Sequence, residues 1–200
     1  MKRFLLLPAA AAVLLAGCVQ SYVSPVSVTR FLGDAPARLG QGPIAVRMAQ
    51  GMPANSLEFA PYAQAVAAEL GRLGYQVVPG TDANAAQVAE VGIARAVDLP
   101  GRVRNPVSVG VGGSTGGYYG GGVGAGIGID LTRPPPDVTS TQMTVTIRDG
   151  AGARPLWEGR AEFAASSNSK FGSAQAAAAK MAAALFAGFP GRSGETTVVR

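Results

Sequence analysis

The sequence predicts an α+β fold: an antiparallel or mixed sheet of about five strands with two helices packed on one face, plus a glycine-rich hairpin or loop. Three patterns predict this architecture. Apolar and polar residues alternate through short segments bounded by turn residues, which is typical of half-buried strands. One segment has apolar residues at helical spacing, and an alanine-rich segment near the C-terminus follows a serine cap. A glycine-dense stretch lies between the predicted strands.

Five segments carry the strand pattern. Residues 43–48 alternate, and residues 75–78 are a short apolar segment bounded by glycine and proline. Residues 86–97 also alternate, but their alanine content leaves a helix open. The segments 138–148 and 156–165 are the clearest pair, because a turn-rich stretch joins them and each has one apolar face. These last two segments predict a β-hairpin.

Two segments carry helix signals. In residues 57–73 the apolar positions that recur at helical spacing are Tyr62, Val66, Leu70 and Leu73. Pro61 fits the first turn of this helix, and Gly74 occupies the position where a left-handed residue commonly follows a helix end. The second helix covers residues 173–187, and the Ser173 hydroxyl is its expected N-cap. Its alanine-rich surface allows close packing on a sheet.

Eleven of the nineteen residues from Gly110 to Gly128 are glycine. Apolar residues alternate with glycine or serine on both sides of its centre, which favours two strands at 107–111 and 123–131, each with one apolar and one nearly bare face. A membrane helix with glycine at every fourth position and a flexible loop are the alternatives. The candidate interaction residues at the tip of this hairpin are Gly112, Gly113, Ser114, Thr115, Gly116, Gly117, Tyr118 and Tyr119.

The N-terminus has the pattern of an export signal. Lys2 and Arg3 precede an apolar stretch that is shorter than the ~20 residues of a transmembrane helix. Leu15–Cys18 resembles the bacterial lipobox, in which the cysteine is acylated and becomes the first mature residue; an ordinary signal peptide with a chance cysteine is the alternative. The expected organisation is a lipoprotein signal peptide at 1–17, a lipidated tether at 18–42, and one α+β domain at 43–200 with a glycine-rich insertion at 107–131.

The composition argues against several classes of function. The chain has no histidine and one cysteine, which removes the usual general base, the commonest metal ligand and any internal disulfide. The net charge of +5 falls to +3 when Lys2 and Arg3 leave with the signal peptide, and the other basic residues are scattered. Nucleic acid is therefore not an expected partner. No Gly-Lys-Ser or Gly-Lys-Thr phosphate loop occurs. We expect no catalytic residues, no metal and no cofactor.

Several short segments together resemble one known family. They are Val28–Phe31, Ser56–Phe59, Tyr62–Ala63, Pro106–Gly116, Leu156–Ala161, Ala184–Phe186 and Phe189–Gly191. These segments resemble the bacterial envelope lipoproteins grouped as domain of unknown function 4136. The resemblance implies an exported lipoprotein with a compact α+β domain, and it carries no reaction and no catalytic residues.

These observations predict a lipid-anchored periplasmic protein with a non-catalytic structural or protein-interaction role. Its expected location is the inner leaflet of the outer membrane, because Val19 rather than aspartate follows Cys18, as in Gram-negative lipoproteins that are sorted onward. The expected partners are the membrane, through the lipid anchor, and other envelope proteins; the oligomeric state is open. The alternatives are a subunit of an oligomeric pore or secretion assembly that uses the glycine-rich hairpin, and a small-ligand binder or enzyme.

Overall fold

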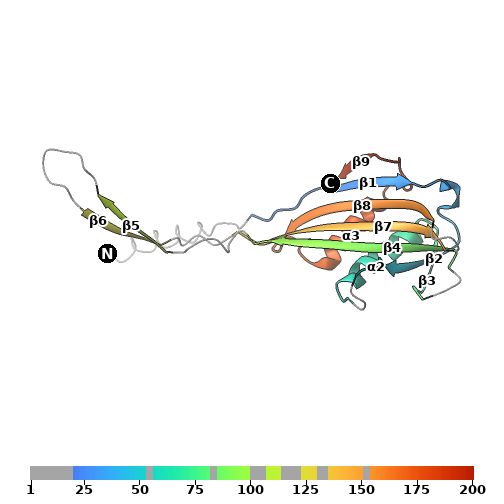
Figure 1. The fold of residues 1–200 in the computed structure, drawn as a ribbon, viewed down its shortest axis with the longest axis horizontal. Helices are drawn as coiled ribbons and strands as arrows, with labels where there is room; N and C mark the ends of the chain where they lie inside the picture. The colour runs from blue at the N-terminus through green and yellow to red at the C-terminus, as the bar shows by residue number, and fades with distance from the viewer. Residues whose placement is uncertain are drawn as a thin grey trace, which may run out of the picture.

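Residues 20–52, 56–81, 85–99, 107–113, 123–129, 135–150 and 154–200 are described in the computed structural model (Figure 1). The elements in chain order are β1 (Val26–Leu32), η2 (Pro36–Arg38), β2 (Pro43–Met48), α2 (Phe59–Arg72), β3 (Gln76–Val78), β4 (Gln87–Asp98), β5 (Val107–Gly113), β6 (Val123–Ile129), β7 (Val138–Asp149), β8 (Pro155–Ser166), α3 (Ala174–Phe186) and β9 (Thr196–Val199).

Seven of the strands form one mixed sheet in the order β3-β2-β4-β7-β8-β1-β9. β2 runs parallel to both β3 and β4, and the other neighbours are antiparallel. The pairing of β4 with β7 extends over twelve residue pairs. The expected α+β class with a mixed sheet is confirmed, but the expected number of about five strands is wrong.

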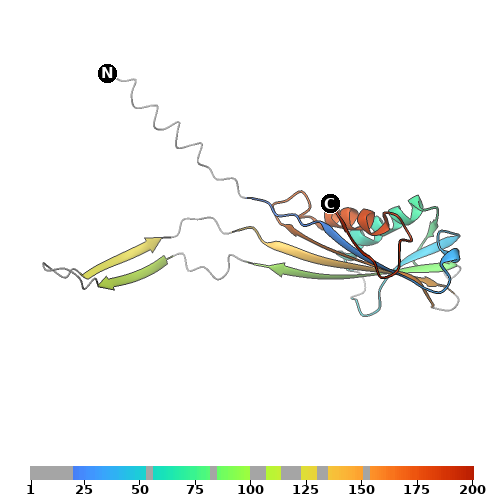
Figure 2. The same cartoon turned by 90° about the horizontal axis from the view of Figure 1, so that it is seen from above.

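Both α-helices cover the same face of the sheet, and among the described residues no α-helix lies on the opposite face (Figure 2). The core lies between these two layers and draws its buried side chains from α2, α3 and the inward positions of β1, β2, β4, β7 and β8. Residues of β7 at Thr141, Met143, Val145 and Ile147 are buried, while their neighbours are exposed or half-buried. This period of two is the one that the sequence predicts for an antiparallel strand with one buried face.

The two strands that the sequence analysis missed are β1 and β9. Val26 and Val28 of β1 are fully buried, but the next inward position is Arg30, so a charge interrupts the apolar alternation. β9 has only four residues and pairs with β1. The expected tether at 18–42 is therefore wrong for residues 22–41, which are bound to the domain through β1, η2 and further hydrogen bonds.

The segment 86–97, for which a helix was the alternative, is the strand β4. The side chains of Ala89 and Val91 point from β4 toward the helices and are fully buried in the core. β4 also lies between two hydrogen-bonded neighbours, β2 and β7, so its backbone is paired on both edges. These tertiary contacts outweigh the helix propensity of its alanines.

Both predicted helices are confirmed. Tyr62, Val66 and Leu70 of α2 are fully buried, and Gly74 follows the helix with a φ of +94°, a left-handed conformation that glycine adopts without a Cβ penalty. The Ser173 side chain accepts a hydrogen bond from the Ala176 amide at 3.3 Å, so it is the N-cap of α3.

Candidate functional site

The glycine-rich insertion lies between β4 and β7, two paired strands of twelve residues each (Figure 1). We call the insertion from residue 99 to residue 137, which carries β5 and β6, the arm. β5 and β6 pair with each other in an antiparallel sheet of two strands, as the alternation of apolar residues with glycine predicts. The two residue numbers of each pair add up to 236 both in the sheet (Asp98 with Val138) and in the arm (Val107 with Ile129). The two connections between the sheet and the described strands of the arm therefore have the same number of residues. The described parts of the arm thus keep the register of the strands from which it departs.

Two of the candidate interaction residues lie in described strands of the arm. Gly112 pairs with Gly124, and Gly113 pairs with Val123. Residues 114–119, which include both tyrosines of the proposed tip, lie outside the described residues, as does Cys18. Because the register adds up to 236, Tyr118 is numerically the midpoint of the arm. The glycine pairs oppose one another across β5 and β6, so each backbone there is open to close approach.

Hydrogen bonds join the base of the arm to the end of β8. The Ser167 amide donates to the Asp137 carbonyl at 2.8 Å, and Val138 pairs with Ser166. Ser166 is fully buried; its amide donates to the Tyr22 carbonyl at 2.8 Å, and its hydroxyl accepts from the Tyr22 amide at 2.9 Å. Val23 then forms a bridge to Ala165. The segment that follows the proposed lipid anchor and the base of the arm are therefore fixed to the same end of the sheet, an arrangement that no local sequence signal indicates.

Two of the segments that carry the family resemblance, Leu156–Ala161 and Phe189–Gly191, meet in an aromatic cluster at the end of α3. The ring of Trp157 stacks on Phe186 at 5.4 Å between centroids and lies 5.2 Å from that of Phe189. The indole N–H of Trp157 donates to the Pro190 carbonyl at 2.9 Å. A Cβ added to Gly159 would come within 2.3 Å of the Trp157 ring. These contacts give the segments Leu156–Ala161 and Phe189–Gly191 a structural role.

Arg30 joins β1 to the C-terminus of α3. Its guanidinium donates to the carbonyls of Leu185 at 2.9 Å, Ala184 at 3.0 Å and Ala187 at 2.8 Å. Burial lowers the pKa of Arg30 from its ordinary value, and the nearby Glu195 opposes this effect. Arginine nevertheless keeps its charge in proteins, so it satisfies the last carbonyls of the helix and faces the negative end of its dipole.

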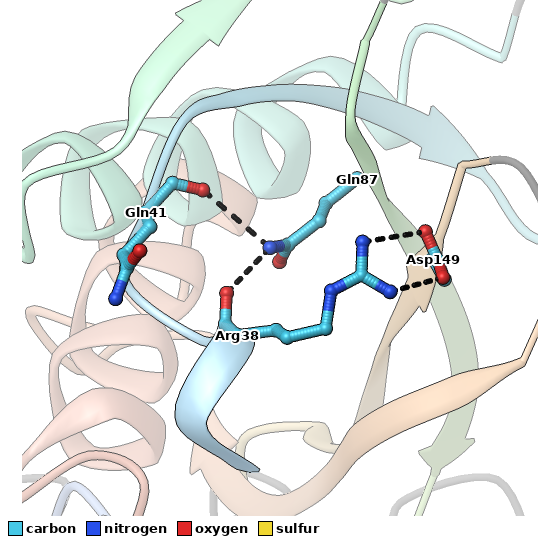
Figure 3. A network of polar contacts seen from close by, with 4 residues as sticks. All are labelled: Arg38, Gln41, Gln87 and Asp149. Carbon is cyan, nitrogen blue, oxygen red and sulfur yellow. Dashed lines mark hydrogen bonds and ion pairs between the residues drawn. The ribbon is translucent and has the colours of Figure 1, made fainter. Parts of the chain in front are cut away.

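A polar network holds the loop before β2 (Figure 3). The network lies at the opposite end of the sheet from the arm, because Gln87 pairs with Asp149 whereas Asp98, where β4 ends, pairs with Val138. The buried Gln87 amide donates to the Arg38 carbonyl at 2.7 Å and the Gln41 carbonyl at 3.4 Å, and its oxygen accepts from the Tyr75 hydroxyl at 3.2 Å. Arg38 also forms an ion pair with Asp149. Each polar group of Gln87 has a partner, so this network stabilises the fold and leaves no polar group of Gln87 to bind a ligand.

A groove of about 510 Å³ lies largely on the open face of the sheet, near the arm. Its lining includes Ser27, Ala94, Ser140, Gln142, Glu162 and Ala164. The Gln142 amide donates to the Glu162 carboxylate at 3.2 Å. The hydroxyls, the amide, the carboxylate and the Arg95 guanidinium, which also pairs with Glu58, can bind a polar surface or a peptide by hydrogen bonds. The groove is therefore, like the arm, a surface suited to contact with another protein.

Among the residues with described positions, no three His, Cys, Asp or Glu side chains are grouped so that they could hold a metal ion. Within the same ranges, no helix is both long enough and apolar enough to cross a membrane.

The fold defines the class of the protein as an α+β domain with a mixed seven-stranded sheet, two helices on one face and an inserted β-arm. The chain belongs to the family described as domain of unknown function (DUF4136), whose model matches residues 39–191. The matched range includes the arm and the aromatic cluster, while β1 and β9 lie outside it. The resemblance found in the sequence is thereby confirmed at the level of the family. A search of curated proteins finds no match.

One solved structure shares the fold at low sequence identity, and two others align with it more weakly. A PDZ domain protein from Parabacteroides distasonis aligns with a TM-score of 0.51 and 12% identity, covering 90% of this chain and 38% of that one. The chain thus spans well under half the length of that protein. A PelC dodecamer from Paraburkholderia phytofirmans aligns with a TM-score of 0.44 and 13% identity, covering 84% and 99% of the two chains. A variant of that dodecamer aligns with a TM-score of 0.43 and 14% identity, covering 80% and 94%.

Proposed function

We propose that this chain is a lipid-anchored periplasmic protein of the bacterial envelope, which binds other envelope proteins through its arm and catalyses no reaction. One observation carries the proposal: β5 and β6 pair with each other and lie equal numbers of residues beyond the paired ends of β4 and β7, so the sheet of the domain leads into a paired hairpin. A hairpin whose two strands are already paired loses less freedom when it binds than an unpaired loop does.

The backbone of the arm suits contact with another chain. β5 and β6 form a sheet of two strands, so each has one edge that is not paired within that sheet. Such an edge is a template for an added strand, and a hairpin of only two strands is marginally stable by itself. Both facts favour pairing with an extended segment of a partner, with glycine allowing close approach.

The non-catalytic part of the proposal rests on the side chains of the sequence. The whole chain has no histidine and a single cysteine, and that cysteine is the proposed acylation site. The polar clusters with described geometry, around Gln87 and around Arg30, bind backbone carbonyls within the domain. Their partners are parts of the fold, which favours structural roles for both.

Replacement of the arm by a short turn tests its role. β4 and β7 are paired as far as Asp98 and Val138, so residues 99–137 can be replaced by Asn-Gly, which forms a tight two-residue hairpin turn. Crosslinking in intact cells followed by affinity purification should recover envelope partners with the native chain and lose them with this variant. The matched control is Val77→Ser, a half-exposed position on the edge strand β3. Unchanged partners in the arm variant would refute the proposal.

The anchor and the location are tested at Cys18. Cys18→Ser removes the thiol that acylation requires. We expect the native chain to cofractionate with the outer membrane and to carry the mass of its acyl chains, and the variant to lose both properties. Retention of the same mass and the same fraction would contradict lipid anchoring.

A subunit of an envelope pore is the second candidate function, and the unpaired edges of β5 and β6 favour it. Neighbouring copies could join these edges into a closed sheet, which removes all edges. The described strands have seven residues each, whereas a membrane-crossing strand needs ~9–11 residues, so flanking residues of the arm would have to contribute. Measurement of the mass of the detergent-extracted protein decides this candidate, because a monomer refutes it.

A further inference from the structure

One row of paired residues crosses the sheet at the end from which the arm departs. Val97 of β4 pairs with Thr139 of β7, Thr139 pairs with Ala165 of β8, and Ala165 bridges to Val23. Both views place the first described residues and the ends of β4 and β7 at the same end of the sheet (Figures 1 and 2). The segment after the proposed anchor and the base of the arm therefore leave the domain together.

This end of the sheet exposes apolar side chains. Tyr22 is 53% exposed, Val97 is 55% exposed and Val23 is 37% exposed. Val97 and Val23 lie on the two flanks of the paired row. A tyrosine with an apolar ring and a polar hydroxyl is the side chain type that concentrates at the boundary between lipid and water.

The short length of chain between the proposed anchor and the sheet limits how far this end of the sheet can lie from the membrane. Three residues separate Cys18 from Tyr22, and Tyr22 is already bound to Ser166 of β8. The four steps from one Cα atom to the next between Cys18 and Tyr22 span at most ~14 Å when the chain is fully extended. An acylated Cys18 lies at the bilayer surface, so the end of the sheet that binds Tyr22 cannot be farther than this from the headgroups. The opposite end lies at the far side of the twelve-residue strand β4, or about 40 Å away at the rise of a strand.

We infer that the end of the sheet bearing Tyr22, Val23 and Val97 rests on the lipid surface, so that the arm leaves the domain beside the membrane. This inference rests on the proposed anchor at Cys18. The charged side chains near this end have both signs: Lys170 lies over the ring of Phe171, while Asp98 and Asp137 flank the base of the arm. We therefore expect the exposed apolar side chains to make the contact with the membrane, without a requirement for lipids of one charge. Partners of the arm would then be sought at or in the membrane.

Fluorescence quenching by lipids tests the inference in the full-length lipidated protein. Cys18 is the only cysteine and its sulfur is acylated, so a cysteine introduced elsewhere can be labelled selectively with an environment-sensitive fluorophore. The test variants are V23C and V97C. The matched control is V77C, because Val77 is 38% exposed, close to the 37% of Val23, and lies in register with Ile44 and Gln87 at the other end of the sheet. The labelled proteins are reconstituted in phosphatidylcholine vesicles that contain a quencher attached to the lipid near the headgroup.

We expect quenching at V23C and V97C to be at least about twofold stronger than at V77C, as for side chains within reach of the interface. Equal quenching at all three positions, with the protein still floating with the vesicles, overturns the inference and leaves the anchor intact. Failure of the native protein to float with the vesicles refutes the anchor itself, and with it the inference. Replacing residues 99–137 by Asn-Gly should leave the quenching pattern unchanged, because the domain end makes the contact.

Discussion

Arg30 provides a direct test of whether β1 is part of the folded domain. The residue lies before the matched family range, in a segment that the sequence suggested as a tether, yet its guanidinium donates to three carbonyls at the end of α3. Arg30→Met keeps a long unbranched side chain and removes all of these donors. If β1 packs as described, this substitution should destabilise the whole domain cooperatively.

The size of the effect follows from the acceptors that lose their donor. The bonds to Leu185 and Ala184 are buried, whereas the bond to Ala187 is half-buried, where water can replace the guanidinium. Two buried acceptors left unsatisfied cost about 1–3 kcal/mol each, and loss of a cation at a helix C-terminus adds about 0.3–1 kcal/mol. Burial lowers the pKa of Arg30, which means that the buried charge is itself unfavourable. Its removal therefore offsets part of this loss. We expect a net loss of about 3 kcal/mol in the free energy of unfolding.

Urea unfolding followed by the fluorescence of Trp157 measures this loss. Trp157 is the only tryptophan, is buried and hydrogen-bonds the chain just after α3. Arg30→Lys keeps the charge but loses the planar fork, so it should lose about half as much free energy. Arg72→Met is the control for loss of a surface charge; it breaks an ion pair between the exposed Arg72 and Glu69 on α2 and should cost below about 1 kcal/mol. An Arg30→Met protein as stable as the Arg72→Met protein would refute the packing of β1.

Three further predictions concern the core. Gly159→Ala should destabilise the domain by about 1–3 kcal/mol in the same urea assay, because the added Cβ would lie 2.3 Å from the Trp157 ring and 2.8 Å from Leu185; an unchanged midpoint would contradict this packing. Tyr62→Phe should change the free energy of unfolding by less than about 1 kcal/mol in either direction, since the buried Tyr62 hydroxyl makes no hydrogen bond of ordinary geometry within the described residues, although the Thr141 side chain lies near it; a large loss would mean that the two side chains are hydrogen-bonded. Burial raises the pKa of Tyr62 and of Tyr75, so the folded protein holds their protons longer than the unfolded chain, and stability should fall as the pH rises above about 10; the Tyr75→Phe protein should lose less stability than the native protein over this pH range in parallel urea titrations.

Local patterns in the sequence were enough to predict several elements of the fold. Turn residues and a period of two specified the β7–β8 hairpin, and helical spacing with a serine cap specified α2 and α3. The alternation of valine with glycine specified β5 and β6, and residue chemistry at the N-terminus is the whole basis for expecting an anchor at Cys18. Each of these signals acts within a few residues of chain, so it can be read without knowledge of the fold.

The places where these elements meet depend on long-range packing, which the local patterns do not contain. β1 has an arginine at an inward position, which is stable because the end of α3 supplies three carbonyls from more than 150 residues away. The bond between Tyr22 and Ser166, which brings the segment after Cys18 to the base of the arm, likewise joins residues 144 positions apart. Contacts of this range leave no periodic trace in the sequence, because each depends on chain packing that brings distant backbone groups within hydrogen-bonding distance.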